Sequence, residues 1–356
     1  MAQITNFFVG ANSGEGFRNL FHEMVELEQM QDFMVLKGGP GVGKNTFMRS
    51  LGHSMEEAGL AVEYLWCSGD PDSLDGVVIP EIRCAVADGT SPHVLEPEYP
   101  AAVDRYVNLG QFYDIAAAKA SVQEVKRCTH AYKAAYVRAY HNLKAARQVE
   151  LDTVNEARAA FDAVKAHRRV DGIISRELRR SGGEAGKTTR RFLGSITHKG
   201  YLWRFDSVDT LCPRVYELQD SFELAGDLLA RLHDAATEKG WDTIVCSAPE
   251  EMDRVEHLLI PSLGLAFITS REGMEYGSRP YRRIRLDAMV DTSPCKGRLS
   301  FQRRMTALLR QEALSALKDA KANHDALEAV YNPYVDFEGV HALAALEAGQ
   351  LLSYRK

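Results

Sequence analysis

The sequence predicts an α/β fold of two doubly wound domains in tandem, each with a parallel sheet and a helical-hairpin appendage. Three observations predict it: a strand, a glycine-rich loop and a helix near the amino end, a set of apolar markers that occurs twice, and a long Ala/Lys/Glu/Arg-rich tract in each half. The length of 356 residues also exceeds what one ordinary core accommodates, so two domains are expected.

The first strand–loop–helix unit begins with the apolar run at residues 33–36, which is typical of a buried parallel strand. Phe47, Leu51 and Met55 recur every four residues and mark one face of a helix that ends near Gly59. The loop between them follows the P-loop pattern G-x-x-x-x-G-K-[ST] except at its last position. The candidate binding residues are Gly38, Gly39, Pro40, Gly41, Val42, Gly43, Lys44, Asn45 and Thr46.

This pattern predicts a site for the phosphates of a nucleotide, with ATP as the expected ligand. Glycines let the main chain curl so that successive N–H groups point at phosphate oxygens, and the amino end of the helix adds its positive dipole. Lys44 would reach the β and γ phosphates as a point charge. The alternative interpretation is a glycine-rich turn between strand and helix that binds nothing.

Asn45 stands where the pattern requires a hydroxyl that ligates Mg²⁺. Its amide oxygen can bind a hard cation, but on a longer arm than Mg²⁺ geometry favours, and the hydroxyl of Thr46 points elsewhere on the helix. Three interpretations therefore stay open: slow hydrolysis, binding without catalysis, or full activity with Asn45 as a metal ligand.

A second apolar run, at residues 82–87, ends in Asp88. The carboxyl end of a strand in an open α/β sheet is where ligands bind, so Asp88 is the candidate to order Mg²⁺. Lys44 and Asp88 are the predicted catalytic residues, and Asn45 and Asp88 the predicted metal ligands. The alternative role of Asp88 is to cap the turn that follows it.

Other polar residues carry weaker predictions. Asp70, Asp72 and Asp75 follow a strand, and one of them could orient attacking water or bind a second substrate; capping of a helix is the favoured role. His93 either contacts the nucleotide or is a solvated loop residue. Two arginine-rich clusters, at residues 176–191 and 279–285, are interpreted mainly as solvated faces, with an arginine finger as the alternative.

The apolar markers repeat in the same order, which predicts a tandem duplication. Phe8-x-Gly10 matches Phe192-x-Gly194, Cys67-Ser68 matches Cys246-Ser247, and Val78-Ile79-Pro80 matches Leu259-Ile260-Pro261. The predicted domains are residues 1–180, with a helical hairpin at about 115–170, and residues 191–356, with a hairpin at about 301–352. Residues 181–190 are the predicted linker, and its Gly186-Lys187-Thr188 is interpreted as a chance resemblance to a P-loop.

The second copy aligns residues 218–227 with residues 36–45 and has lost every loop glycine. Asp220, Glu223 and Asp227 would repel phosphate, so this copy is expected to be structural or regulatory.

Composition excludes several classes of protein. The formal net charge of −6 argues against a dedicated nucleic-acid binder. The six cysteines form no C-x-x-C pair, no apolar run is long enough to span a bilayer, and the amino-terminal residues do not resemble a signal peptide. A cytoplasmic protein is therefore expected, with a nucleotide and an unidentified second substrate or protein as partners; an oligomer stays open.

The segments at residues 8–17, 37–41, 75–81 and 88–93 together resemble an uncharacterised family of bacterial ATPases built from tandem P-loop units. The resemblance covers nearly the whole chain and implies a P-loop fold and ATP binding, without a known substrate. Family members typically have Ser or Thr after the P-loop lysine and often a second P-loop, and this chain departs on both counts. We expect ATP binding with weak Mg²⁺-dependent hydrolysis; the alternatives are a small-molecule or nucleoside kinase and a non-catalytic nucleotide sensor.

Overall fold

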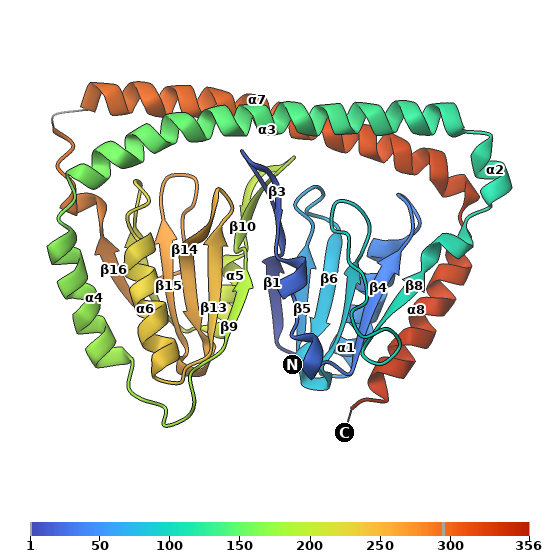
Figure 1. The fold of residues 1–356 in the computed structure, drawn as a ribbon, viewed down its shortest axis with the longest axis horizontal. Helices are drawn as coiled ribbons and strands as arrows, with labels where there is room; N and C mark the ends of the chain where they lie inside the picture. The colour runs from blue at the N-terminus through green and yellow to red at the C-terminus, as the bar shows by residue number, and fades with distance from the viewer. Residues whose placement is uncertain (1, 294–295, 356) are drawn as a thin grey trace.

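The computed structural model describes residues 2–293 and 296–355. It contains two six-stranded sheets that stand side by side below a pair of long helices (Figure 1). In spatial order, the strands of the first sheet are β1 (Ile4–Phe8), β5 (Val62–Trp66), β6 (Leu74–Ile79), β7 (Cys84–Asp88), β4 (Asp32–Lys37) and β8 (Asp104–Asn108).

The second sheet repeats this order strand for strand. Its strands are β9 (Thr188–Arg191), β13 (Thr243–Ala248), β14 (Glu251–Ile260), β15 (Leu265–Ser270), β12 (Arg214–Gln219) and β16 (Arg282–Arg285). Each copy also has a small hairpin, β2 (Gly10–Ser13) with β3 (Gly16–Asn19) and β10 (Gly194–Thr197) with β11 (Gly200–Trp203). The common topology is what the predicted duplication requires.

The sheets are mixed and not parallel as predicted, because β6 and β14 run antiparallel to both of their neighbours. The chain between β5 and β6, residues 67–73, is too short for the crossover that two parallel strands need. Pro80 and Pro261 begin even shorter turns, which lead into β7 and β15. Each copy therefore contains a three-strand meander. The strand that precedes the glycine-rich loop does have parallel neighbours on both sides.

The two copies meet at their edge strands. Phe8 at the end of β1 and Phe192 after β9 exchange two main-chain hydrogen bonds of 2.9 and 2.8 Å. Both rings are fully buried in a core that the copies share. The short helix α5 (Phe205–Leu211) of the second copy adds to this contact, because the Ser207 hydroxyl donates to Asn6 O at 2.6 Å.

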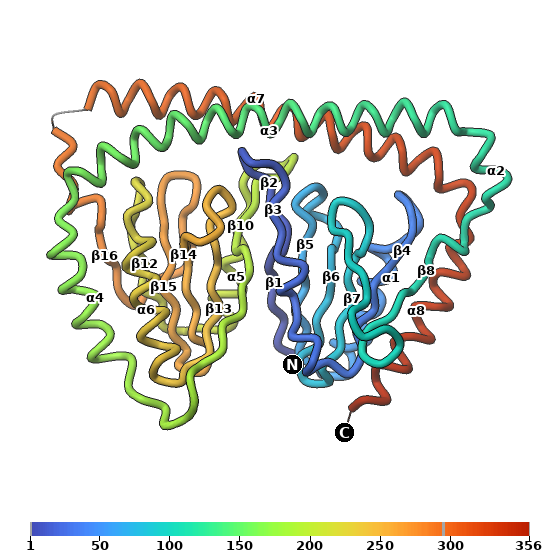
Figure 2. The backbone as a smooth tube through the Cα atoms, in the orientation of Figure 1, coloured from blue at the N-terminus to red at the C-terminus, as the bar shows by residue number. Residues whose placement is uncertain are grey.

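The predicted helical hairpins do not form. Helix α3 (Val122–Ala159) is continuous through the middle of the first predicted hairpin, and it pairs with α7 (Lys296–Tyr331) along the tops of both sheets (Figure 2). A seam of small residues and leucines permits this close approach, and its buried members are Ala139, Leu143, Ala313, Ala316 and Leu317. At 38 residues, α3 is about 57 Å long, which is enough to pass from one copy to the other.

The helices that follow are exchanged between the copies. Helix α4 (Ala163–Glu177) packs on α6 (Gly226–Glu238) of the second copy, and α8 (Phe337–Leu352) packs on α1 (Lys44–Glu57) of the first. The predicted domains, which end at residue 180 and begin at residue 191, therefore do not match the packed units, because each unit includes a helix from the other half of the sequence. The predicted linker also ends early, because Thr188 already lies in β9; its Gly-Lys-Thr leads into a strand and not into a helix.

None of the helices within residues 2–293 and 296–355 is both long and apolar enough to cross a membrane. The longest ones, α3 and α7, carry charged residues along their whole length.

Candidate phosphate-binding site

The glycine-rich loop, residues 38–43, connects the carboxyl end of β4 to the amino end of α1. Met34, Val35 and Leu36 are buried in the sheet, and Phe47, Leu51 and Met55 hold α1 against it, as the sequence predicts. Gly41 and Gly43 have φ angles of 73° and 90°, which side-chain-bearing residues rarely adopt. The loop thus has the strand–turn–helix context that the pattern requires.

Lys44 is the first residue of α1, and its side chain folds back over the loop. Its Nζ donates to Gly38 O at 2.8 Å and to Gly39 O at 3.1 Å, and it lies 3.6 Å from Asp88 Oδ2. Lys44 and Asp88, the two predicted catalytic residues, are therefore brought together at the mouth of the loop.

Asp88 caps the turn that follows it, and its position leaves the predicted metal role open. It ends β7 beside Leu36 of β4, so it lies at the carboxyl edge of the sheet next to the loop. Its Oδ1 accepts from the amide and hydroxyl of Thr90, at 2.8 and 2.6 Å, and caps the turn. Its Oδ2 faces Lys44 and is the oxygen that could take part in ordering a metal ion.

Asn45 is turned toward the protein. Its Oδ1 accepts from Leu74 N at 3.1 Å and from Arg49 Nε at 3.2 Å. The amide oxygen would have to leave both donors before it could ligate Mg²⁺, whereas a hydroxyl on a shorter arm would not reach them. Thr46 is exposed on the outer face of α1, as its place in the sequence predicts.

A buried acid–histidine pair lies near Lys44 and was only partly anticipated. His93 Nε2 is 3.5 Å from Asp75 Oδ1, and the rings of Phe17 and Phe21 pack on the imidazole. His93 is therefore buried, and the interpretation of it as a solvated loop residue is wrong. Burial raises the pKa of Asp75, and the charge of Asp88 raises it further, while His93 and Lys44 lower it. A lone Asp within the apolar run at residues 74–79 was the available signal.

Asp70 and Asp72 do not cap a helix, because residues 71–72 form a turn. Asp70 stabilises this turn by accepting from the Ser73 hydroxyl at 2.8 Å. Both carboxylates pair with lysines from distant parts of the chain: Asp70 lies 3.5 Å from Lys321 of α7, and Asp72 pairs with Lys199 of the second copy.

The walls around the loop come from the two long helices and their connections. Tyr113, which precedes α2 (Ile115–Lys119), donates its hydroxyl to Pro40 O at 2.6 Å. A Cβ on Gly41 would come within 2.7 Å of Asn332 and 3.2 Å of Glu328 O at the end of α7. The loop therefore depends on α7, a helix that follows the second copy in the sequence.

In the second copy, the equivalent loop carries its own anion. Asp220, which takes the place of Gly38, is buried, and its two carboxylate oxygens accept from Leu224 N and Ala225 N, each at 2.8 Å. In the first copy, Val42 and Gly43 occupy the places of Leu224 and Ala225. Within the described residues, no protein acceptor is found for their amides.

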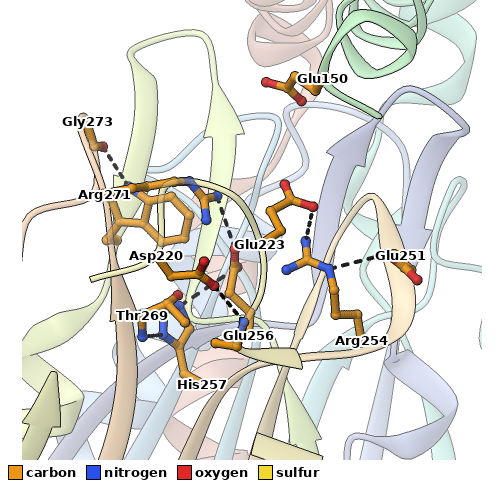
Figure 3. Close-up of polar contacts among 12 residues, drawn as sticks. Glu150, Asp220, Glu223, Glu251, Arg254, Glu256, His257, Thr269, Arg271 and Gly273 are labelled. Atoms are coloured by element: carbon orange, nitrogen blue, oxygen red, sulfur yellow. Dashed lines mark hydrogen bonds and ion pairs between the residues drawn. The ribbon is translucent and has the colours of Figure 1, made fainter. Parts of the chain in front are cut away.

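Charge pairs fill the rest of the second site. Glu223 replaces Gly41, keeps a positive φ of 55°, and binds Arg147 of α3 at 2.9 Å and Arg254 at 3.2 Å. Glu256 binds Arg271 at 3.1 Å, and Figure 3 shows this pair together with the Arg254–Glu223 pair. In the second copy, carboxylates of the chain itself therefore occupy the place where the sequence predicts that phosphate binding has been lost.

Two cavities lie around this second site. One, of about 280 Å³, is lined by the β2–β3 turn, α3 and Glu223. The other, of about 460 Å³, lies at the carboxyl ends of β12 and β15, with Arg271, Arg283 and Asp287 among its lining residues. Both are lined by charges of opposite sign that already pair with each other, as Arg147 does with Glu223 and Arg283 with Glu217.

The arginine-rich clusters are largely exposed, as predicted, but some of their arginines also bind carboxylates of the protein. Arg191 is buried and binds Glu63 of the first copy at 2.7 Å, and Arg190 binds Glu23 at 3.0 Å. In the later cluster, Arg283 binds Glu217 at 2.6 Å. The first cluster thus connects the two copies, and the contacts of Arg283 lie within the second sheet.

No protein family, curated protein or solved structure matches this chain.

Proposed function

We propose that the first copy binds a nucleoside triphosphate, ATP, at residues 38–46 and hydrolyses it slowly with Mg²⁺. The observation that carries this proposal is the contrast between the two loops. In the second copy a buried carboxylate takes the amides of residues 224 and 225, whereas the first copy has Gly38 at that position and leaves the matching amides to an external anion. We also propose that the chain is a member of the tandem P-loop family that its sequence resembles.

The loop amides, Lys44 and Asp88 would each take a different part in binding. The amides of the loop and the amino end of α1 would hold the phosphates, and Lys44 would exchange its contacts with Gly38 O and Gly39 O for phosphate oxygens. Mg²⁺, when bound, would neutralise the charge that develops on the phosphates. Asp88 Oδ2 is the oxygen placed to hold the ion or one of its waters, while Asn45 fits the ion only after releasing Leu74 N and Arg49.

A melting experiment tests the binding. ATP in excess should raise the melting temperature by mass action, and the rise should disappear in Lys44→Ala. Asp227→Ala, a change at an exposed carboxylate in the second copy, is the control and should keep the full rise. A wild-type chain that melts at the same temperature with and without ATP and Mg²⁺ would remove the proposal.

A nucleotide sensor without turnover is the second candidate, and the two hydrogen bonds accepted by Asn45 favour it. Asn45→Ser separates the two functions. A serine hydroxyl is free to ligate Mg²⁺, so we expect Mg²⁺-dependent phosphate release to rise several-fold, with little change in ATP affinity. An unchanged rate in Asn45→Ser, with tight ATP binding, would favour the sensor.

A further inference from the structure

Helices α3 and α7 occupy equivalent places over the two copies. Asp162 and Asp336 cap the helices that follow them, each by accepting a hydrogen bond of 3.0 Å from the third helical residue. Arg147 of α3 and Lys321 of α7 are the same number of residues apart in the sequence as these two caps. The two residues are therefore equivalent in the duplication. A cation thus stands at the same point of each long helix.

The second copy shows what the α3 cation reaches. Arg147 is buried and binds Glu223, the residue that replaces Gly41 in the loop, at 2.9 Å. Glu251, the first residue of β14, lies 3.7 Å from Arg147. A cation from the long helix therefore binds an anion at the mouth of the degenerate loop, and that anion belongs to the chain.

The first copy has the cation without the internal anion. Gly41 has no side chain, and Lys321 instead pairs with Asp70 at 3.5 Å and with Asp325 on its own helix. A second cation, Lys199 in the β10–β11 turn, pairs with Asp72 of the same first-copy turn. This turn is tied to the start of α1, because Arg49 donates to Asp72 O and also to Asn45.

We propose that Lys321 and Lys199 are contacts for the terminal phosphate of the bound triphosphate. The inference rests on the proposed nucleotide site and deepens it. The γ-phosphate of the nucleotide binds where the Glu223 carboxylate lies in the other copy. On binding, Lys321 leaves Asp70 and Lys199 leaves Asp72, and both lysines contact the phosphate instead. Because both lysines come from outside the first copy, the site is complete only with the second copy and α7 in place, and it prefers triphosphate to diphosphate.

Calorimetry with ATP and ADP, both with Mg²⁺, tests this on the full chain. Lys321→Ala and Lys199→Ala should each weaken ATP binding about tenfold, the usual scale of one charge-assisted contact, while ADP affinity changes less than about twofold. Lys321→Arg should retain the preference for ATP. Lys144→Ala, a lysine of α3 that pairs with Glu15 near the second copy, is the matched control and should bind both nucleotides as the wild type does.

The outcomes separate the inference from the function on which it rests. An unchanged ATP-to-ADP affinity ratio in both alanine variants overturns the inference, even if Lys44→Ala still abolishes binding. Equal losses for ATP and ADP also overturn it, because they would indicate a structural role for the lysines. A wild-type chain that binds neither nucleotide removes the inference and the proposed function together.

Discussion

Asp220 is the residue that most clearly separates the two copies. It is buried, and burial raises the pKa of its carboxyl while the hydrogen bonds from Leu224 N and Ala225 N lower it. A carboxylate placed against two loop amides is the same chemistry that a phosphate would use in the first copy. This side chain marks the difference between the loops: in the second copy a carboxylate of the chain accepts from two loop amides, whereas in the first copy no protein acceptor for the matching amides is found within the described residues.

Removing this carboxylate should destabilise the second copy. Asp220→Ala leaves two buried amides without an acceptor, and we expect a loss of about 2 kcal/mol in the free energy of unfolding. Urea titration measures it. Asp227→Ala, seven residues later and exposed, should change the free energy by less than about 0.5 kcal/mol. Equal effects of the two substitutions would contradict the role given to Asp220.

His257 makes the fold sensitive to acid. The imidazole is fully buried, and its Nδ1 accepts from Thr269 N at 3.1 Å. Burial is the largest cause that lowers its pKa, from 6.5 to about 4, against the opposing charge of Glu256. Between those two pH values the unfolded chain binds a proton that the folded chain does not, so stability falls as the pH falls from 6.5 to 4.

This proton linkage predicts a loss of up to about 3 kcal/mol across that pH window. His257→Asn retains an acceptor near Nδ1 but does not titrate, so its stability should change less between pH 6.5 and 4. Urea titrations of both proteins at several pH values measure the difference. Parallel pH profiles would show that His257 is not the group responsible.

At the scale of elements, the exchanged helices are the main departure from the sequence prediction. The amphipathic tracts at 115–170 and 301–352 were correctly predicted to be helical, but periodicity within a tract does not specify its partner. The apolar face of α4 meets Leu228 and Leu232 of the second copy, and that of α8 meets Leu51 and Met55 of the first. Only the tertiary structure reveals that each copy is completed by the helix of the other.

The exchange predicts that a change in α8 weakens the first copy. Leu351 is fully buried against α1, and Leu351→Ala should cost about 2–4 kcal/mol and increase hydrogen exchange in α1 more than in α6. Leu346→Ala on the same helix, where the side chain is 59% exposed, is the control. Increased exchange confined to α6 would contradict the exchanged packing.

At the scale of the whole molecule, the sequence predicted the two α/β units, the loop and the loss of glycines in the second copy. Glycine and lysine spacing carries that information locally. The mixed sheets could have been inferred from the short turns at Pro80 and Pro261. The pairing of Asp70 with Lys321, and of Asp72 with Lys199, could not, because it joins segments that only the paired long helices bring together.

The two copies form one unit in which α3 and α7 extend over the carboxyl edges of both sheets (Figure 1). The buried Arg191–Glu63 pair and the Phe8–Phe192 hydrogen bonds connect the sheets below them. If the proposed function is right, a ligand held between the loop and α7 would contact parts of both copies, and the degenerate copy would then contribute to binding.

Isothermal titration of the wild-type chain with ATP and Mg²⁺ measures how many nucleotides each chain binds. We expect one ATP for each chain, because Asp220 and Glu223 already occupy the second loop, and no heat of binding in Lys44→Ala. Two equivalents of ATP for each chain, or one equivalent that persists in Lys44→Ala, would contradict it.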